Sequence, residues 1–120
     1  MTTQQIADRL VELCRTGKSR QAYRELFAEN AKAIDPAMQQ PVTEGLENLL
    51  AKDAAFEEMV IELHELRVGD PIVADQHFAC TMYIDITTER GRNTDEEICV
   101  YQVKDGKIVL EQFFYTMPEE

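Results

Sequence analysis

The chain has 120 residues, 44% of them hydrophobic, and a net charge of −11 from 23 acidic and 12 basic residues. This length predicts one domain, residues 1–120, with a hydrophobic core of its own. The acidic balance argues against a nucleic-acid-binding protein, which needs clustered Lys and Arg, and against binding to an anionic membrane. No apolar run approaches the roughly 20 residues of a membrane span. The N-terminus has no basic or apolar targeting segment, so we expect a cytoplasmic protein.

The first quarter of the chain is predicted to form two helices. Thr2 and Gln5 fit a capping box, and Gly17 is a plausible stop for the first helix. Ser19 is placed to cap a second, short helix. The apolar face of this second helix consists of Ala22, Tyr23, Leu26 and Phe27.

A short strand is predicted next, at residues 31–34, because Asp35 precedes a proline and residues before proline leave the helical region. A loop follows at residues 36–41, and Thr43 is placed to cap a third helix. Its apolar stripe comprises Leu46, Leu49, Leu50 and Ala54. Asp53 falls on the same stripe.

The second half of the chain is predicted to form strands. The first covers residues 59–68, with a helix as an open alternative, and a turn follows at residues 69–71. Residues 76–88 alternate, with Phe78, Cys80, Met82 and Ile84 on one face. After a loop at residues 89–93, a hairpin covers residues 96–115. Helices followed by consecutive strands predict an α+β domain, with helices packed on one face of an antiparallel sheet.

The order of these elements and several local strings resemble the nuclear-transport-factor-2-like superfamily, especially its SnoaL-like and ketosteroid-isomerase-like members. The matching strings begin at Leu26, Ile34, Glu44, Asp105 and Glu111, and read LFAENA, IDP, EGL, DGKIV and EQFFY. The resemblance covers essentially the whole chain and implies a curved, mixed sheet wrapped around three helices into a cone. It also implies an apolar pocket at the open end and a homodimer formed through the outer face of the sheet. It does not settle function, because members of the superfamily include both enzymes and non-catalytic binders.

The turn at Asp105-Gly106 decides which face of the hairpin lines the pocket. A two-residue turn puts Tyr101 on the face of Ile108 and Leu110, whereas a three-residue loop puts it on the face of Val109 and Glu111. The resemblance favours the second register. The expected pocket side is then Glu97, Cys99, Tyr101, Val109, Glu111, Phe113 and Tyr115, joined by Phe78, Cys80 and Met82. The expected outer, dimer-forming side is Ile98, Val100, Leu110, Gln112 and Phe114.

Asp35 is the first candidate for chemistry. The resemblance places it at the general-base aspartate of the isomerase-like members, where a carboxylate in an apolar site can shuttle a proton. The alternative is that Asp35 only caps an Asp-Pro turn. The isomerases also use two acidic donors, whose positions here hold Leu10 and Cys99. Neither can replace them, so steroid-isomerase chemistry by that arrangement is not expected.

Glu97 and Glu111 are further candidates: if both face the cavity, at least one should have an abnormal pKa. The alternative is that both lie at the rim in water, or that the other register of the hairpin holds. Tyr101 and Glu111 would orient the ligand, and Tyr23 or Tyr115 would supply further hydroxyl groups. Cys14, Cys80 and Cys99 are read as reduced thiols, since their spacing matches no metal or redox motif. We expect no cofactor, and no His, Asp or Glu spacing indicates a metal site.

Three hypotheses about function follow. The first is a cofactor-independent isomerase, cyclase or lyase that uses Asp35, Tyr101 and Glu111 on a small apolar or amphipathic molecule. The second is a non-catalytic ligand-binding module with the same pocket. The third is a dimerisation module whose cavity is imperfect packing.

Overall fold

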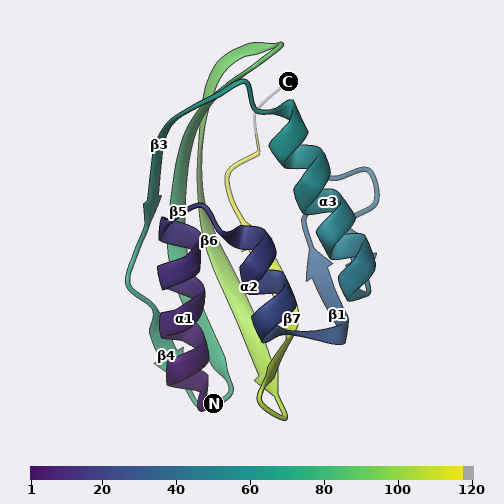
Figure 1. Cartoon of the computed structure of the whole chain (residues 1–120), viewed down its shortest axis with the longest axis vertical. Coiled ribbons are helices and arrows are strands. Elements are labelled where there is room, and N and C mark those ends of the chain that lie inside the picture. The colour runs from purple at the N-terminus through teal and green to yellow at the C-terminus, as the bar shows by residue number, and fades with distance from the viewer. Residues whose placement is uncertain (118–120) are drawn as a thin grey trace.

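The computed structural model describes residues 1–117. Within this range, three helices cover one face of a seven-stranded sheet (Figure 1). In chain order the elements are α1 (Thr3–Arg15), α2 (Ser19–Leu26), β1 (Phe27–Ile34), β2 (Val42–Glu44), α3 (Leu46–Met59), β3 (Glu62–Val68), β4 (Ile72–Ala74), β5 (His77–Thr88), β6 (Gly91–Lys104) and β7 (Lys107–Phe114).

The sheet is mixed, and the predicted α+β class is confirmed. Its strand order is β2-β1-β7-β6-β5-β3, with β4 beside β5. The pair β1 and β7 is parallel, and the other pairs between described strands are antiparallel. Because β1 follows α2 directly and lies beside the last strand, the first and second halves of the chain share one sheet and enclose one core (Figure 1).

The capping box of α1 is confirmed. The Thr2 hydroxyl accepts from the Gln5 N–H at 3.1 Å, and the Gln5 side-chain oxygen accepts from the Thr2 N–H at 2.8 Å. The helix ends at Arg15, and Gly17 follows with a φ of 72°, which a glycine adopts without strain. The buried face of α1 consists of Ile6, Ala7, Leu10, Val11 and Leu13.

The predicted N-terminal caps of α2 and α3 are both wrong. The cap of α2 is Lys18, and the Ser19 hydroxyl instead donates to Asp53 Oδ1 on α3 at 2.8 Å. Thr43 lies in β2, a strand that the sequence did not predict, and α3 is preceded by Gly45 with a φ of 90°. Ser19 is therefore the first residue of α2, and its hydroxyl links α2 to α3 instead of capping a helix.

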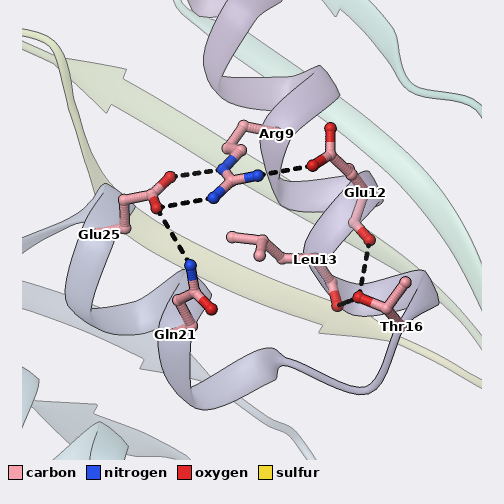
Figure 2. A network of polar contacts seen from close by, with 6 residues as sticks. All are labelled: Arg9, Glu12, Leu13, Thr16, Gln21 and Glu25. Carbon is pink, nitrogen blue, oxygen red and sulfur yellow. Dashed lines mark hydrogen bonds and ion pairs between the residues drawn. The ribbon is translucent and has the colours of Figure 1, made fainter.

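A polar network holds α1 against α2 (Figure 2). The Arg9 guanidinium donates to both carboxylate oxygens of Glu25, at 2.7 and 3.0 Å, and to Glu12 at 2.6 Å. The Glu25 carboxylate also accepts from Gln21 at 3.4 Å. Bidentate Arg–carboxylate pairs restrain orientation as well as distance. The network therefore restrains the rotation of α2, on which Tyr23 is carried.

Residues 59–68 contain the end of α3 at Met59 and then strand β3, so the helical alternative for this segment is excluded. Several strands are longer than predicted. β1 begins at Phe27, immediately after α2. β6 begins at Gly91, so only residues 89–90 of the predicted loop at residues 89–93 form a turn. β4 was not predicted. These short or flanking strands carry too few residues for their alternation to stand out in the sequence.

The β6–β7 hairpin has the predicted faces but a different turn. Asp105 and Gly106 both have positive φ, 51° and 76°, and Lys104 pairs with Lys107, so the turn has two residues. A β-bulge then shifts the register, and Tyr101 pairs with Glu111. The bulge corrects one predicted position: Ile108, which is 0% exposed, lies inward in place of Val109.

The two faces of the sheet differ in exposure. The core lies between the helices and the inner face, where Tyr101, Phe78, Ile6, Leu10, Leu26, Leu49, Ile108 and Cys99 are the largest fully buried side chains. On the outer face, Ile98 and Phe114 are neighbours on adjacent strands and are each 49% exposed. The outer face therefore carries uncovered apolar surface. Among the described helices, none has the length and apolar character needed to span a membrane.

Candidate functional site

A cavity of about 100 Å³ lies between the helices and the inner face of the sheet. Every helix and four strands contribute to its wall. The lining residues are Leu10, Cys14, Ser19, Ala22, Tyr23, Phe27, Asp53, Met82, Tyr101, Glu111 and Phe113. The wall is mostly apolar, and its polar groups are two carboxylates, three hydroxyls and a thiol.

Glu111 is the central polar group of this cavity. Glu111 is only 4% exposed, and its Oε1 accepts a hydrogen bond from the Tyr23 hydroxyl at 2.7 Å. Burial raises the pKa of Glu111 from 4.5 to about 7, against the opposing effect of the Tyr23 and Tyr101 hydroxyls. Both protonation states of Glu111 are therefore populated near neutral pH.

Local sequence explains how Glu111 and its neighbours reach the cavity. Past the bulge, β7 alternates regularly, so Glu111 and Phe113 share the inner face with their partners Tyr101 and Cys99 on β6. Tyr23 comes from the buried side of α2, and the contact between Tyr23 and Glu111 joins residues 88 positions apart.

Aromatic rings connect the tyrosines of the site. The Tyr23 and Phe27 ring centroids lie 4.6 Å apart, and Phe27 meets Tyr101 edge-on at 6.4 Å. Phe78 stacks on Tyr101 with ring centroids 4.7 Å apart and is not among the residues that line the cavity. Burial raises the pKa of both Tyr23 and Tyr101 well above 10, so both hydroxyls stay protonated as hydrogen-bond donors.

Asp53 lines the cavity, although no functional role was predicted for it from the sequence. Its Oδ1 accepts from Ser19, whereas its buried Oδ2 has no hydrogen-bond partner within residues 1–117. The nearest cation is Arg20, whose Nε lies 3.9 Å from Oδ2, beyond hydrogen-bond distance. The sequence did contain a sign of this role, because Asp53 falls on the apolar stripe of a predicted helix. Burying a carboxylate there is unfavourable unless a partner or a ligand compensates its charge.

Asp35 does not line this cavity. Its Oδ1 accepts from the Tyr115 hydroxyl and, at 3.2 Å, from the Ala37 N–H, which is the local turn contact expected of an Asp-Pro sequence. Burial and Asp35 together raise the pKa of Tyr115. The structure thus brings Tyr101 and Glu111 together and leaves Asp35 in a separate pair with Tyr115.

Glu97 and Cys99 also lie outside the cavity lining. Burial raises the pKa of Glu97 to about 7, and the carboxylates of Asp95 and Asp35 add to that effect. The Cys99 thiol donates to Glu97 Oε1 at 3.5 Å. Glu97 and Tyr115, which were predicted to line the pocket, therefore form with Asp35 a second acidic group outside the cavity lining.

The cysteines are free thiols. Burial raises the pKa of Cys14 to about 12 and that of Cys80 to about 11, so neither is an activated nucleophile. In the part of the chain that the structure describes, no three His, Cys, Asp or Glu side chains are placed to hold a metal ion.

A larger groove of about 370 Å³ runs over the surface between α2 and α3, beside Arg20, Arg24 and Glu47. It is open to solvent, and none of its lining residues is buried. We therefore place the candidate site in the inner cavity, where a carboxylate is removed from water.

Comparison with known proteins identifies the class. Residues 1–115 match the SnoaL-like domain family. A structure described as a candidate SnoaL-like polyketide cyclase from Mesorhizobium loti is 30% identical, with a TM-score of 0.89 over 96% of this chain and 100% of that one. The chain therefore belongs to the SnoaL-like family. None of the curated proteins matches it in sequence.

More distant structures share the fold. TerC, co-crystallised with polyporic acid, is 11% identical with a TM-score of 0.75, over 95% of this chain and 91% of that one. A Catenulispora acidiphila protein with a ketosteroid-isomerase-like fold, in complex with trimethylamine, is 14% identical with a TM-score of 0.71, over 93% and 85%. At these identities the likeness shows the fold alone.

Proposed function

We propose that the chain binds a small organic molecule in the inner cavity and moves a proton on it through Glu111, without a metal or cofactor. The observation that carries this proposal is the buried Glu111–Tyr23 contact of 2.7 Å in the wall of a cavity. A general acid or base works best with a pKa near the working pH, and that of Glu111 is raised to about 7. The reaction class is isomerisation, cyclisation or elimination.

Each polar group then has a defined role. Glu111 takes a proton from the ligand or returns one, and Tyr23 orients the carboxylate. Tyr101 supplies a neutral hydroxyl that can donate to a developing oxyanion on the ligand. The 30% identical relative, described as a candidate polyketide cyclase, supports chemistry of this type. Asp35 and Tyr115 lie apart from the ligand in this proposal, and a proton could be exchanged between their side chains and the nearby Glu97 carboxylate.

A second candidate function is ligand binding without catalysis. The cavity, about 100 Å³, holds about three water volumes, whereas ligand pockets usually measure about 300–1,000 Å³. The donor positions of the isomerases hold Leu10 and Cys99, which cannot stabilise an enolate. A small ligand that Glu111 and Tyr23 bind without reaction would fit both the small volume of the cavity and the residues at the donor positions.

The test is a ¹³C NMR titration of the Glu111 side chain, combined with native mass spectrometry of the purified protein. We expect a titration midpoint near 7 and a bound small molecule that is lost in Glu111→Gln. Glu58→Gln is the matched control, because it makes the same charge change at an exposed site on α3. A Glu111 midpoint at the ordinary value of 4.5 would overturn the acid–base role and leave the binding role.

We also propose that the outer face of the sheet forms a homodimer. Ile98 and Phe114 lie side by side there, with half of each residue exposed, and Val42 on β2 is 49% exposed. Apolar neighbours on an otherwise acidic surface favour a self-complementary contact about a twofold axis. Sedimentation equilibrium at micromolar concentration tests this, and a monomer would contradict it.

A further inference from the structure

We propose that the inner cavity accepts a small organic cation, an aliphatic ammonium ion, as its ligand. The inference rests on the proposed function in one respect, that the inner cavity is the binding site. It goes further by naming the charge and size of the molecule that binds.

The two carboxylates of the cavity keep free acceptor capacity, and two of its three hydroxyls already donate to them. The Tyr23 hydroxyl donates to Glu111, and the Ser19 hydroxyl donates to Asp53 Oδ1. Asp53 Oδ2 is buried in the described structure without a hydrogen-bond partner. A ligand that donates hydrogen bonds would therefore satisfy an atom that is otherwise costly to bury.

The charges around the cavity favour a cation. Its lining includes two carboxylates, Glu111 and Asp53, and no Lys or Arg among the described residues. Arg20 remains 3.9 Å from Asp53 Oδ2 and pairs more closely with Glu57, at 2.7 Å. An anionic ligand would add a negative charge to a buried site, whereas an ammonium ion would neutralise one.

The rest of the wall suits the apolar part of such a cation. Four aromatic rings line the cavity, from Tyr23, Phe27, Tyr101 and Phe113. Ring faces attract cations, with a larger effect where water is excluded. The net charge of −11 raises the local concentration of cations around the protein.

The volume limits the size of the ligand. An apolar cavity of about 150 Å³ holds benzene, so the present cavity corresponds in proportion to about four non-hydrogen atoms. Isopropylamine, which is an ammonium ion at neutral pH, has this size. 2-Propanol and acetate are the matched neutral and anionic compounds.

Binding of the cation is expected to depend on pH through Glu111. The groups that act on Glu111 are Tyr23 from α2, Tyr101 from β6, and Lys52 and Asp53 from α3. The Cys14 thiol on α1 and the Cys80 thiol on β5 are also near enough for Glu111 to raise their pKa values. The cation prefers ionised Glu111, so affinity should rise as the pH increases through about 7.

The experiment records methyl NMR shifts of Met82 and Leu10 while each of the three compounds is added at pH 6 and pH 8. Isopropylamine is expected to shift both signals with saturation, and more tightly at pH 8. Asp53→Asn should weaken binding at least about tenfold, as expected for a charge-assisted hydrogen bond. Glu111→Gln should remove the pH dependence, and the exposed control Glu58→Gln should leave affinity within about twofold of the wild type.

Each other outcome overturns the inference in a recognisable way. If 2-propanol or acetate saturates the Leu10 and Met82 signals while isopropylamine does not, the cavity binds ligands but not cations. If isopropylamine binds equally well to Asp53→Asn and Glu111→Gln, it sits elsewhere on the acidic surface. If none of the three compounds shifts these signals while Glu111 still titrates near 7, the cation inference fails and the acid–base proposal stands.

Discussion

Replacing Glu111 with Gln should change how the stability of the protein depends on pH. The substitution keeps the shape of the side chain and an oxygen that accepts from the Tyr23 hydroxyl, and it removes the buried ionisable group. In the wild type, the pKa of Glu111 is raised from 4.5 to about 7 in the folded state. The folded state therefore holds the proton more tightly than the unfolded state.

The sign and size follow from this difference. Below pH 4.5 the carboxyl group is protonated in both states, and its contribution to stability is fully present. As the pH rises through about 7, folding must bury a charge, and the free energy of unfolding falls. A difference of roughly 2.5 pKa units corresponds to a loss of about 3 kcal/mol. That is a large part of the 5–15 kcal/mol typical of a domain.

The assay is urea unfolding of the wild type and Glu111→Gln at pH 5, 6, 7 and 8. The wild type should lose about 2.5 kcal/mol more than the variant across this range, because the rest of the loss falls below pH 5. Burial also raises the pKa of Glu97 to about 7, so the Glu97→Gln variant is needed to separate the two contributions. Parallel curves for the wild type and Glu111→Gln would refute the reasoning, because they would mean that Glu111 has the same proton affinity in both states.

Three further outcomes are expected. Tyr23→Phe removes the hydroxyl that donates to Glu111, so the free energy of unfolding in urea should fall by about 1–3 kcal/mol at pH 8 and by less at pH 5. Equal losses at the two pH values would contradict the Tyr23–Glu111 hydrogen bond. Gly106→Ala should cost about 1 kcal/mol in thermal unfolding, because a φ of 76° strains an alanine, and an unchanged midpoint would argue against this left-handed backbone at residue 106. Phe114→Lys should convert a dimer to a monomer in sedimentation equilibrium, whereas the control Phe56→Lys, on exposed α3 surface, should not; a dimer that survives Phe114→Lys would place the interface elsewhere.

Part of the site could be predicted from the sequence. Alternation put Glu111 and Phe113 on one face of the last strand, but it left two registers open for Tyr101, and the resemblance favoured the one that joins Tyr101 to that face. The structure places all three residues on the wall of the cavity. The turn was misassigned nonetheless. A two-residue turn followed by a bulge gives the same faces as a three-residue loop, so the pattern of faces could not distinguish them.

The partners of single polar residues were harder to predict than the faces of strands. Asp35 has the sequence position of a general base but contacts Tyr115 and its own turn. Ser19 has the residue type of a helix cap, yet its hydroxyl donates to Asp53 on another helix. A hydroxyl or carboxylate can satisfy several partners, and the choice depends on which element lies nearby in space.

The sequence by itself determined the order of the helices and the longer strands, the α+β class and the alternation within each of these elements, because these follow from spacings of two to four residues along the chain. Only the tertiary structure decided which polar groups meet. The parallel pairing of β1 with β7 and the packing of α2 over the sheet bring Tyr23 to Glu111, and the packing of α2 against α3 brings Ser19 to Asp53. These contacts join residues 88 and 34 positions apart, and no local pattern encodes them.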